Sequence, residues 1–395
     1  MENNQLKIVY LIPGGLFNSG GMERVTTIKA NYLSEKMGYD VSIVTTEQME
    51  QPVFFPLSKK VHLHHLRIGI HSNFGKESYL KKIISRYFKI KQYKKALTQL
   101  LNEIKPDITI SLLGLDIGFL NNIKDGSIKI GELHFPGNFR QLMGQKMYNN
   151  SLIPNYVEKV RTKELKEKSG KLTRLIVLTQ EEKSSWKNCK NVEVIANPLA
   201  FLPEKTSSCT SKKAIAVGRL VYEKGFDQLI EVWRTIHEKY PDWELSIYGN
   251  GDQKEKLLNL IKQYNLERVI KIHDPSKDIQ SQFIEHSIML FPSRYLEALP
   301  MVLIEAMSCG IPIVAFDAPC GPKDVIRDGK NGFLVKSGDV ETFTNKTLQL
   351  IESEDLRKFM GKSSRELSLN YSEDKIMQQW ISLFQEVIKI NNSVI

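Results

Sequence analysis

Short apolar runs alternate with amphipathic segments along most of the chain. Residues 7–13 (KIVYLIP) are apolar, residues 22–37 repeat apolar side chains at helical spacing, and residues 40–46 return to the first pattern. Near-continuous apolar strands separated by helices are typical of parallel sheets that are covered on both faces. Further strands are predicted at 106–113, 128–134, 174–179, 192–198, 213–220, 243–249, 269–274, 288–293, 311–316 and 332–335. The pattern therefore predicts an α/β protein.

A polar stretch without periodicity divides this pattern into two halves. Residues 199–212 (LAFLPEKTSSCTSK) are predicted to be a linker between an N-terminal domain, 1–198, and a C-terminal domain, 213–371. Residues 372–395 are expected to form a C-terminal helix that can pack back on the first domain. A length of 395 residues suits two cores. We expect two Rossmann-like, doubly wound domains facing a cleft, with ligands at the carboxyl ends of the strands.

Charge is distributed unevenly between the two halves. Residues 1–198 contain 30 Lys and Arg against 18 Asp and Glu, a net charge of +12, whereas the remaining residues have 25 against 27, a net of −2. The excess positive charge of the first half suggests an anionic surface or partner there. No stretch reaches the roughly 18 apolar residues of a membrane span, and the four cysteines form no CxxC pair. A cytoplasmic location is expected.

The segment 293–310 (SRYLEALPMVLIEAMSCG) carries two glutamates in apolar surroundings. It follows a predicted strand, Pro300 suits the first turn of a helix, and Gly310 can end that helix. A helix that begins at the carboxyl edge of a sheet offers free N–H groups to a phosphate. Glu297 would precede this anion site, and Glu305 would follow it, where Glu305 could accept hydrogen bonds from vicinal hydroxyls. The alternative is that both glutamates are solvated surface residues. The apolar neighbours of Glu305 disfavour this alternative. The N–H groups concerned belong to Leu299, Met301 and Val302.

Residues 217–230 (VGRLVYEKGFDQLI) form a second strand–loop–helix unit. Arg219 and Lys224 lie on its loop, and a guanidinium with an ammonium group is a common device for holding a diphosphate. By themselves the two could equally be ordinary surface cations. No metal site is predicted, because the only histidine cluster, residues 62–65 (HLHH), reads better as a strand with alternating faces.

Two further loops of the first half have features of a site. The glycine loop 13–25 (PGGLFNSGGMERV) lacks the GxGxxG spacing of dinucleotide-binding folds, yet Gly20 and Gly21 let the backbone approach a phosphate or sugar closely. His134 ends a predicted strand and would face the cleft, although a lone histidine is more often structural.

A basic amphipathic helix is predicted at 76–101. Apolar side chains recur there at helical spacing among eight Lys and Arg and a single acid, Glu77. Such a helix suits an anionic membrane surface, and a buried helix with a solvated lysine face is the alternative. The charge of the first half favours the membrane.

Together these motifs resemble the family-4 retaining glycosyltransferases of the GT-B architecture, especially bacterial capsule, O-antigen and glycan-assembly enzymes. The resemblance covers nearly the whole chain. It rests on the motifs at 20–25 (GGMERV), 194–199 (VIANPL), 217–230, 248–257 (YGNGDQKEKL) and 292–335.

The resemblance implies roles for individual residues. Arg219 and Lys224 match the pair that holds the donor diphosphate, and Glu305 matches the glutamate that binds the ribose hydroxyls. Leu299, Met301 and Val302 would add backbone donors at the leaving group.

Four other positions also match residues of the family that contact the donor. Glu297 matches the glutamate against the reacting face of the transferred sugar, and His134 matches the first-domain histidine that contacts this sugar. Gly20 and Gly21 match the glycine loop near the donor phosphates.

The implied reaction moves a hexose or N-acetylhexosamine from a UDP-sugar, with retention and without a metal or other cofactor. The expected acceptor is a lipid-linked or membrane-proximal glycan of cell-surface polysaccharide biosynthesis, at the inner face of the cell membrane. A soluble or teichoic-acid acceptor is one alternative, and a nucleotide-sugar 2-epimerase is another that the glutamate pair disfavours. Nucleic-acid binding is not expected, because no recognition motif or stacking platform is present.

Overall fold

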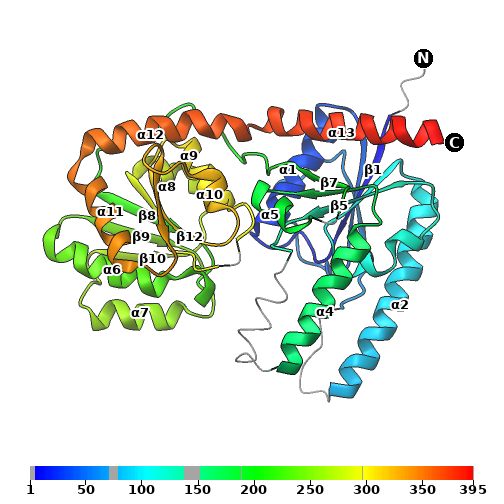
Figure 1. Ribbon diagram of the computed structural model, residues 1–395, viewed down its shortest axis with the longest axis horizontal. Helices are drawn as coiled ribbons and strands as arrows, with labels where there is room; N and C mark the ends of the chain where they lie inside the picture. Colours follow the sequence, from blue (N-terminus) through cyan, green and yellow to red (C-terminus); the bar gives the residue numbers. More distant parts are fainter. Residues whose placement is uncertain (1–4, 71–78, 138–151, 188, 296, 395) are drawn as a thin grey trace. The chain divides into compact units, whose positions relative to one another are not determined.

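The computed structural model describes residues 5–70, 79–137, 152–187, 189–295 and 297–394 (Figure 1). The chain divides into two compact units. Unit 1 comprises residues 1–198 and 376–395, and unit 2 comprises residues 199–375.

Unit 1 is built on a parallel sheet with the strand order β3-β2-β1-β4-β5-β6-β7. The order reverses between β1 and β4, and the carboxyl edge of the sheet at such a reversal is where doubly wound proteins bind ligands. The strands are β1 (Lys7–Ile12), β2 (Asp40–Thr45), β3 (His62–His65), β4 (Ile108–Ser111), β5 (Ile128–Leu133), β6 (Arg174–Val177) and β7 (Val192–Val194).

Helices cover both faces of this sheet with separate apolar clusters. One cluster joins α1 and the part of α13 from Ile376 onward to the strands, and the other contains residues of α2, α4 and the loops around β4. Figure 1 shows α2 and α4 extending away from the sheet. The helices are α1 (Gly21–Glu35), α2 (Tyr79–Ile104), α4 (Leu152–Ser169), α5 (Gln180–Ser185) and α13 (Glu373–Val394).

Unit 2 repeats the architecture with the strand order β10-β9-β8-β11-β12-β13, again all parallel, and it reverses between β8 and β11. The strands are β8 (Lys213–Val217), β9 (Glu244–Tyr248), β10 (Ile270–His273), β11 (Ile288–Phe291), β12 (Ile313–Asp317) and β13 (Gly332–Lys336). The helices are α6 (Phe226–Lys239), α7 (Lys254–Gln263), α8 (Ile279–Glu285), α9 (Met301–Ser308), α10 (Pro322–Val325), α11 (Val340–Glu352) and α12 (Glu354–Ser368).

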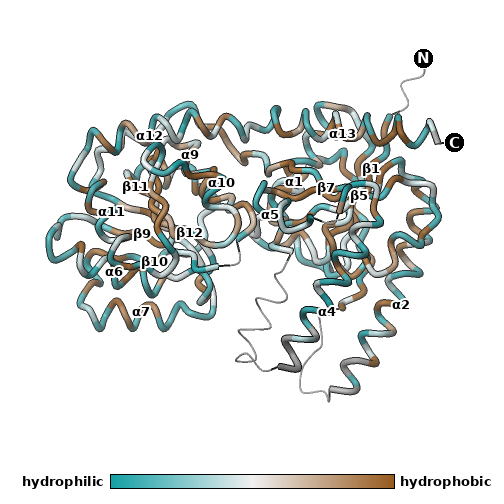
Figure 2. Tube along the Cα trace, in the orientation of Figure 1, coloured by the Kyte–Doolittle hydropathy of each residue, from teal (hydrophilic) through white to brown (hydrophobic). Residues whose placement is uncertain are grey.

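The predicted strands are all present, and most end earlier than their apolar runs. The run 213–220, for example, yields β8, while Leu220 is fully buried in the following loop. An apolar pattern reports burial, and a loop residue that packs under the sheet edge is as buried as a strand residue. Figure 2 shows the hydrophobic residues concentrated along the strands. The histidine cluster 62–65 forms β3, which confirms the strand interpretation.

The helix predicted at 76–101 is present from Tyr79, and residues 76–78 lie outside the described residues. Every helix among the described residues is too short or too polar to cross a bilayer.

Candidate functional site

The clearest concentration of polar side chains in unit 2 lies where the strand order reverses, on the loops that follow β8 and β11. The Lys224 ammonium is 2.5 Å from Oε1 of Glu297, and the Ser293 hydroxyl donates to the same carboxylate oxygen. Glu297 is only 5% exposed, whereas the Lys224 side chain keeps 20% of its surface open. The structure thus brings together two predicted site residues that are 73 positions apart.

Arg294 fastens these two loops to each other. Its guanidinium donates to both carboxylate oxygens of Asp227 at 2.8 Å, and its backbone N–H donates to the Glu223 carbonyl at 2.9 Å. Burial alone would raise the pKa of Asp227, but the Arg294 guanidinium outweighs it and holds that pKa below its usual range. The planar, bidentate contact fixes the spacing of the loops that carry Lys224 and Glu297.

Two glycines allow the backbones of this region to approach closely. Gly225 has φ +68°, and a Cβ at this position would lie 2.1 Å from the Pro292 carbonyl oxygen. Gly321 has φ +95°, and its Cβ would lie 2.2 Å from the Ala298 oxygen. Any larger residue would push the loop after β11 away from its neighbours.

Arg219 lies at the start of the loop after β8 and is exposed. Its neighbour Leu220 donates from its N–H to the Asn250 carbonyl at 2.9 Å, which ties this loop to the one after β9. Within the described part of the chain, the Arg219 guanidinium makes no hydrogen bond or ion pair, so its five donors are open to a ligand.

Helix α9 begins directly after this region. Pro300, predicted for its first turn, is instead the N-cap residue, and Gly310 with φ +73° follows its last turn as predicted. The first described backbone bond at this end runs from Leu303 to Pro300, at 3.1 Å. The N–H groups that precede it have no hydrogen bond among the described residues; they belong to Leu299, Met301 and Val302.

Glu305 is on α9 and is 2% exposed. The pKa of the Cys309 thiol is raised to about 12, mainly because the thiol is buried and also because the negative charge of Glu305 lies near it. A buried carboxylate is costly unless hydrogen-bond donors compensate it. The solvated-surface interpretation of Glu297 and Glu305 is therefore wrong.

The glycine loop of unit 1 leaves β1 at the point where that sheet's order reverses. The Gly14 carbonyl accepts from the N–H groups of Thr46 and Glu47, at 3.1 and 3.2 Å, which fastens the loop to the end of β2. Gly20 is the N-cap of α1 and has no side chain to shield the first turn, and Gly21 opens the helix.

His134 follows β5 and faces a buried ion pair that the sequence analysis did not anticipate. The His134 Nε2 atom is 3.0 Å from Oε1 of Glu132, and Oε2 of Glu132 binds the ammonium of Lys29 on α1. A signal for Lys29 was present in the sequence, since it shares the helical face of Val25, Tyr32 and Leu33, all of them buried. A charge in that register predicts a buried partner.

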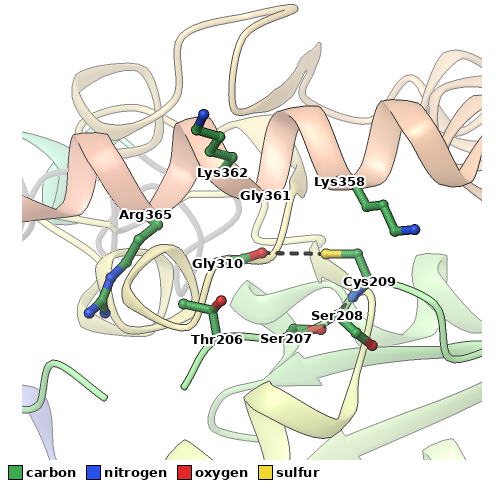
Figure 3. Close-up of a pocket in the computed structure, with 9 residues that line it drawn as sticks. All are labelled: Thr206, Ser207, Ser208, Cys209, Gly310, Lys358, Gly361, Lys362 and Arg365. Carbon is green, nitrogen blue, oxygen red and sulfur yellow. Dashed lines mark hydrogen bonds between the residues drawn. The ribbon is translucent and has the colours of Figure 1, made fainter. Parts of the chain in front are cut away.

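A small cavity in unit 2 lies apart from these residues. It measures about 190 Å³ and is lined by residues of the 206–209 segment, Gly310 and α12 (Figure 3). Its cations do not converge, because Lys358 pairs with Glu354, Arg365 donates to the Pro203 carbonyl, and Lys362 points away from the hollow. The described residues also contain no group of three or more His, Cys, Asp or Glu suited to a metal ion.

Two parallel sheets with helices on their faces, each with a reversal of strand order, define a doubly wound α/β protein, and unit 2 has cations and helix N–H groups at its reversal point. Residues 201–367 match the family model "Glycosyl transferases group 1". An uncharacterized glycosyltransferase of Haemophilus influenzae is 31% identical over 92% of this chain and 96% of that protein. The amylovoran biosynthesis glycosyltransferase AmsD of Erwinia amylovora is 30% identical over 95% of this chain and 98% of its own length.

Solved structures agree on the fold. The S. aureus TarM variant crystallised with UDP, alpha-GlcNAc-glycerol and fondaparinux superposes with a TM-score of 0.76 at 19% identity, covering 96% of this chain and all of that one. The chain belongs to the group 1 glycosyltransferases, and the predicted GT-B architecture of two Rossmann-like domains is confirmed.

Proposed function

We propose that this glycosyltransferase moves a hexose or N-acetylhexosamine from a UDP-sugar, with retention of anomeric configuration, to a lipid-linked or membrane-proximal glycan. The observation that carries the proposal is the Lys224–Glu297 pair at the reversal point of the sheet in unit 2, with the exposed Arg219 on the same loop as Lys224.

The diphosphate of the donor is bound by Arg219, Lys224 and the start of α9. The two cations neutralise the phosphate charge, and the N–H groups of Met301 and Val302 donate to its oxygens. Negative charge on the diphosphate increases in the transition state, because the diphosphate is leaving. These groups therefore stabilise the transition state more than the ground state, and so they contribute to catalysis. No divalent metal is required in this scheme.

The two buried glutamates take opposite ends of the donor. Glu305, which is 2% exposed, accepts hydrogen bonds from the ribose hydroxyls. Glu297 faces the transferred sugar and stabilises positive character at its anomeric carbon. When the diphosphate enters, it shares the Lys224 ammonium with Glu297, so the glutamate becomes available to the sugar.

The reaction breaks the bond between the anomeric carbon and the diphosphate oxygen. The acceptor hydroxyl forms the new bond on the same face of the sugar, and its proton passes to the departing phosphate oxygen. This explains why no dedicated base is needed near Glu297.

The choice of UDP and of a polysaccharide acceptor is supported by relatives. TarM was crystallised with UDP, and AmsD is named for amylovoran biosynthesis. A capsule or O-antigen pathway is the corresponding proposal for this chain.

Membrane attachment at the cytoplasmic face is proposed through α2. The second half of this helix is buried through Tyr93 and Leu97, but in the first half Ile84, Tyr87 and Phe88 are 54%, 65% and 62% exposed. Lysines and arginines surround these side chains. Exposed aromatic residues among cations suit the headgroup region of an anionic bilayer.

A panel of UDP-, GDP- and ADP-sugars, scored by nucleotide release with and without EDTA, tests the donor. Release from a UDP-sugar that EDTA leaves unchanged is expected. Release only from GDP- or ADP-sugars would refute the UDP assignment, and conversion of a UDP-sugar to its 2-epimer without acceptor would replace the proposal by an epimerase.

Flotation with vesicles that contain anionic lipid tests whether the protein binds a membrane through α2, as a membrane-proximal acceptor requires. The wild type is expected to float, and Tyr87→Ser/Phe88→Ser is expected to float less. The matched control is Phe359→Ser, which removes an aromatic side chain that is 59% exposed on α12 in the other unit. Absence of wild-type binding would favour a soluble or teichoic-acid acceptor.

A further inference from the structure

The buried ion pair of unit 1 has no role in the scheme above. Lys29 and Glu132 have side chains that are 0% and 1% exposed, on α1 and at the end of β5. A fully buried ion pair is often no more stable than apolar residues of the same volume. Its occurrence beside a histidine at the carboxyl edge of the sheet therefore calls for a function other than stability.

The two oxygens of Glu132 are divided between two partners. Oε2 binds the Lys29 ammonium, and Oε1 lies 3.0 Å from Nε2 of His134. The two atoms do not meet the criteria of a hydrogen bond, so this is a close polar contact between the carboxylate and the ring. A carboxylate facing Nε2 favours the proton on that nitrogen.

Glu132 stays ionised in this setting. Burial raises its pKa, but the Lys29 ammonium and the contact with His134 outweigh burial and hold the pKa well below its usual range. Burial lowers the pKa of Lys29, and the attraction of Glu132 opposes this. Tyr10 on β1 also faces the pair, and its own pKa is raised by burial and then by Glu132.

An aromatic wall holds Lys29 in place. Its Nζ lies 4.2 Å from the centroid of the Trp380 ring on α13 and 5.4 Å from that of Tyr10. The ammonium therefore has cation–π contacts on one side and the carboxylate on the other. The C-terminal helix thus completes the environment of a charge that lies next to the histidine loop.

The loop that carries His134 is also fixed at its other end. Oε1 of Glu182 accepts from the Gly137 N–H at 3.0 Å and from the Trp186 indole at 2.6 Å. Within the described part of the chain, no hydrogen bond reaches the second ring nitrogen of His134, Nδ1.

We infer that Lys29 and Glu132 are positioning residues for His134. Glu132 keeps the proton on Nε2 and orients the ring, and Lys29 keeps Glu132 ionised and in place. Nδ1 is then a fixed acceptor for a hydroxyl of the transferred sugar. This inference rests on the proposed function for the identity of that hydroxyl. The tautomer and orientation of His134 do not depend on the proposed function.

The first test compares Glu132→Gln with the wild type. Glutamine keeps the shape but not the charge, so kcat for transfer is expected to fall by about ten- to a hundredfold through misplacement of the ring. The affinity for UDP alone, whose proposed contacts are all in unit 2, is expected to stay unchanged.

The second test uses pH to separate Lys29 from Glu132. In Lys29→Met the carboxylate loses its cation, so its pKa rises and a larger fraction of it is protonated at a given pH. The activity of this variant relative to the wild type is expected to recover as pH rises, since Glu132 then ionises, whereas Glu132→Gln shows no such recovery. Equal pH profiles for the two variants would overturn the role of Lys29.

The third test separates positioning from stability. Lys29→Met/Glu132→Gln removes the charge pair, and its stability is expected to exceed that of Lys29→Met. Its kcat stays low if the pair positions His134, and returns to the wild-type value if the pair is only structural. Lys129→Met/Asp125→Asn is the matched control, because this pair is 9% and 0% exposed on the same strand and the preceding turn but does not contact the histidine.

A measurement without substrate keeps the inference testable if the variants do not fold or no donor is found. Nitrogen NMR of the imidazoles, with His134→Gln to assign the signal, is expected to show the Nε2–H tautomer of His134 in the wild type. The Nδ1–H tautomer would overturn the inference. Absence of nucleotide release from every nucleotide sugar would refute the proposed function and leave this result standing.

Discussion

Two Lys–Glu pairs lie at the carboxyl edges of the two sheets, and they differ in their access to solvent. In unit 2 the Lys224 side chain is 20% exposed and shares Glu297 with a serine hydroxyl. In unit 1 Lys29 is completely buried between Glu132 and aromatic rings. The chemical groups are the same, but their environments give them different possibilities.

An ammonium group that reaches solvent can bind an anionic ligand while it loosens its contact with the carboxylate. The negative charge of the ligand then replaces part of the interaction with the carboxylate. A buried ammonium cannot do this without leaving its carboxylate uncompensated. The comparison therefore supports the two proposals, substrate binding for the open pair and support of a neighbouring group for the closed pair.

The largest expected effect is on stability. Lys29→Met leaves Glu132 buried without its cation and is expected to lower the free energy of unfolding by about 3–5 kcal/mol. Lys224→Met breaks a pair whose cation reaches solvent and leaves Glu297 bonded to the Ser293 hydroxyl, so it is expected to cost less, about 1–2 kcal/mol. Chemical denaturation of both variants, followed by circular dichroism, gives the two values. Equal losses would remove the distinction between the pairs.

The second prediction reverses this order for activity. Lys224→Met removes a charge that stabilises the leaving diphosphate, so kcat is expected to fall by about 10²- to 10³-fold. Lys224→Arg is expected to recover part of the rate, because it restores the charge but not the geometry. Single-turnover nucleotide release measures the step. A Lys224→Met enzyme with a wild-type rate would place the diphosphate elsewhere.

The third prediction concerns the buried glutamate that has been assigned to the ribose. Glu305→Ala removes the acceptor of two charge-assisted hydrogen bonds, and UDP affinity is expected to fall by roughly a hundredfold or more. Calorimetric titration with UDP measures this. Glu255→Ala, at an exposed position of α7, serves as the control. Unchanged UDP affinity in Glu305→Ala would contradict the assignment of Glu305.

The fold could be predicted from the sequence because each of its βα units has its own local pattern of apolar residues, and this pattern is repeated along the chain. Each strand is a short apolar run, and the reversal points follow from the strand order that such βα units adopt. The unit 2 residues could be predicted for a similar reason, since Arg219, Lys224, Glu297 and Glu305 stand on loops and helices next to recognisable strands.

The residues that hold the candidate site residues in place could not be predicted in the same way. Arg294 and Asp227 are separated by 67 positions, and Lys29 and Glu132 by 103, so no local pattern connects them. A charge on a buried helical face indicates that a partner exists, but only the packed structure shows which one. The sequence therefore predicts the groups that are proposed to bind the ligand more readily than the residues that hold these groups in place.

The smallest expected effect tests how closely the loops of unit 2 must approach. Gly225 and Gly38 both have φ +68°, but a Cβ at Gly225 would lie 2.1 Å from the Pro292 oxygen, whereas a Cβ at Gly38 meets nothing within 4 Å. Alanine at either site bears the left-handed strain of about 1–2 kcal/mol, and Gly225→Ala is expected to lose about 1–3 kcal/mol more through the clash. Denaturation midpoints of the two variants give this difference. Because the clash moves the loop that carries Glu297, Gly225→Ala should also weaken UDP-sugar turnover while Gly38→Ala leaves it intact. If both alanines cost the same, the close approach of these loops is not what holds Lys224 and Glu297 together.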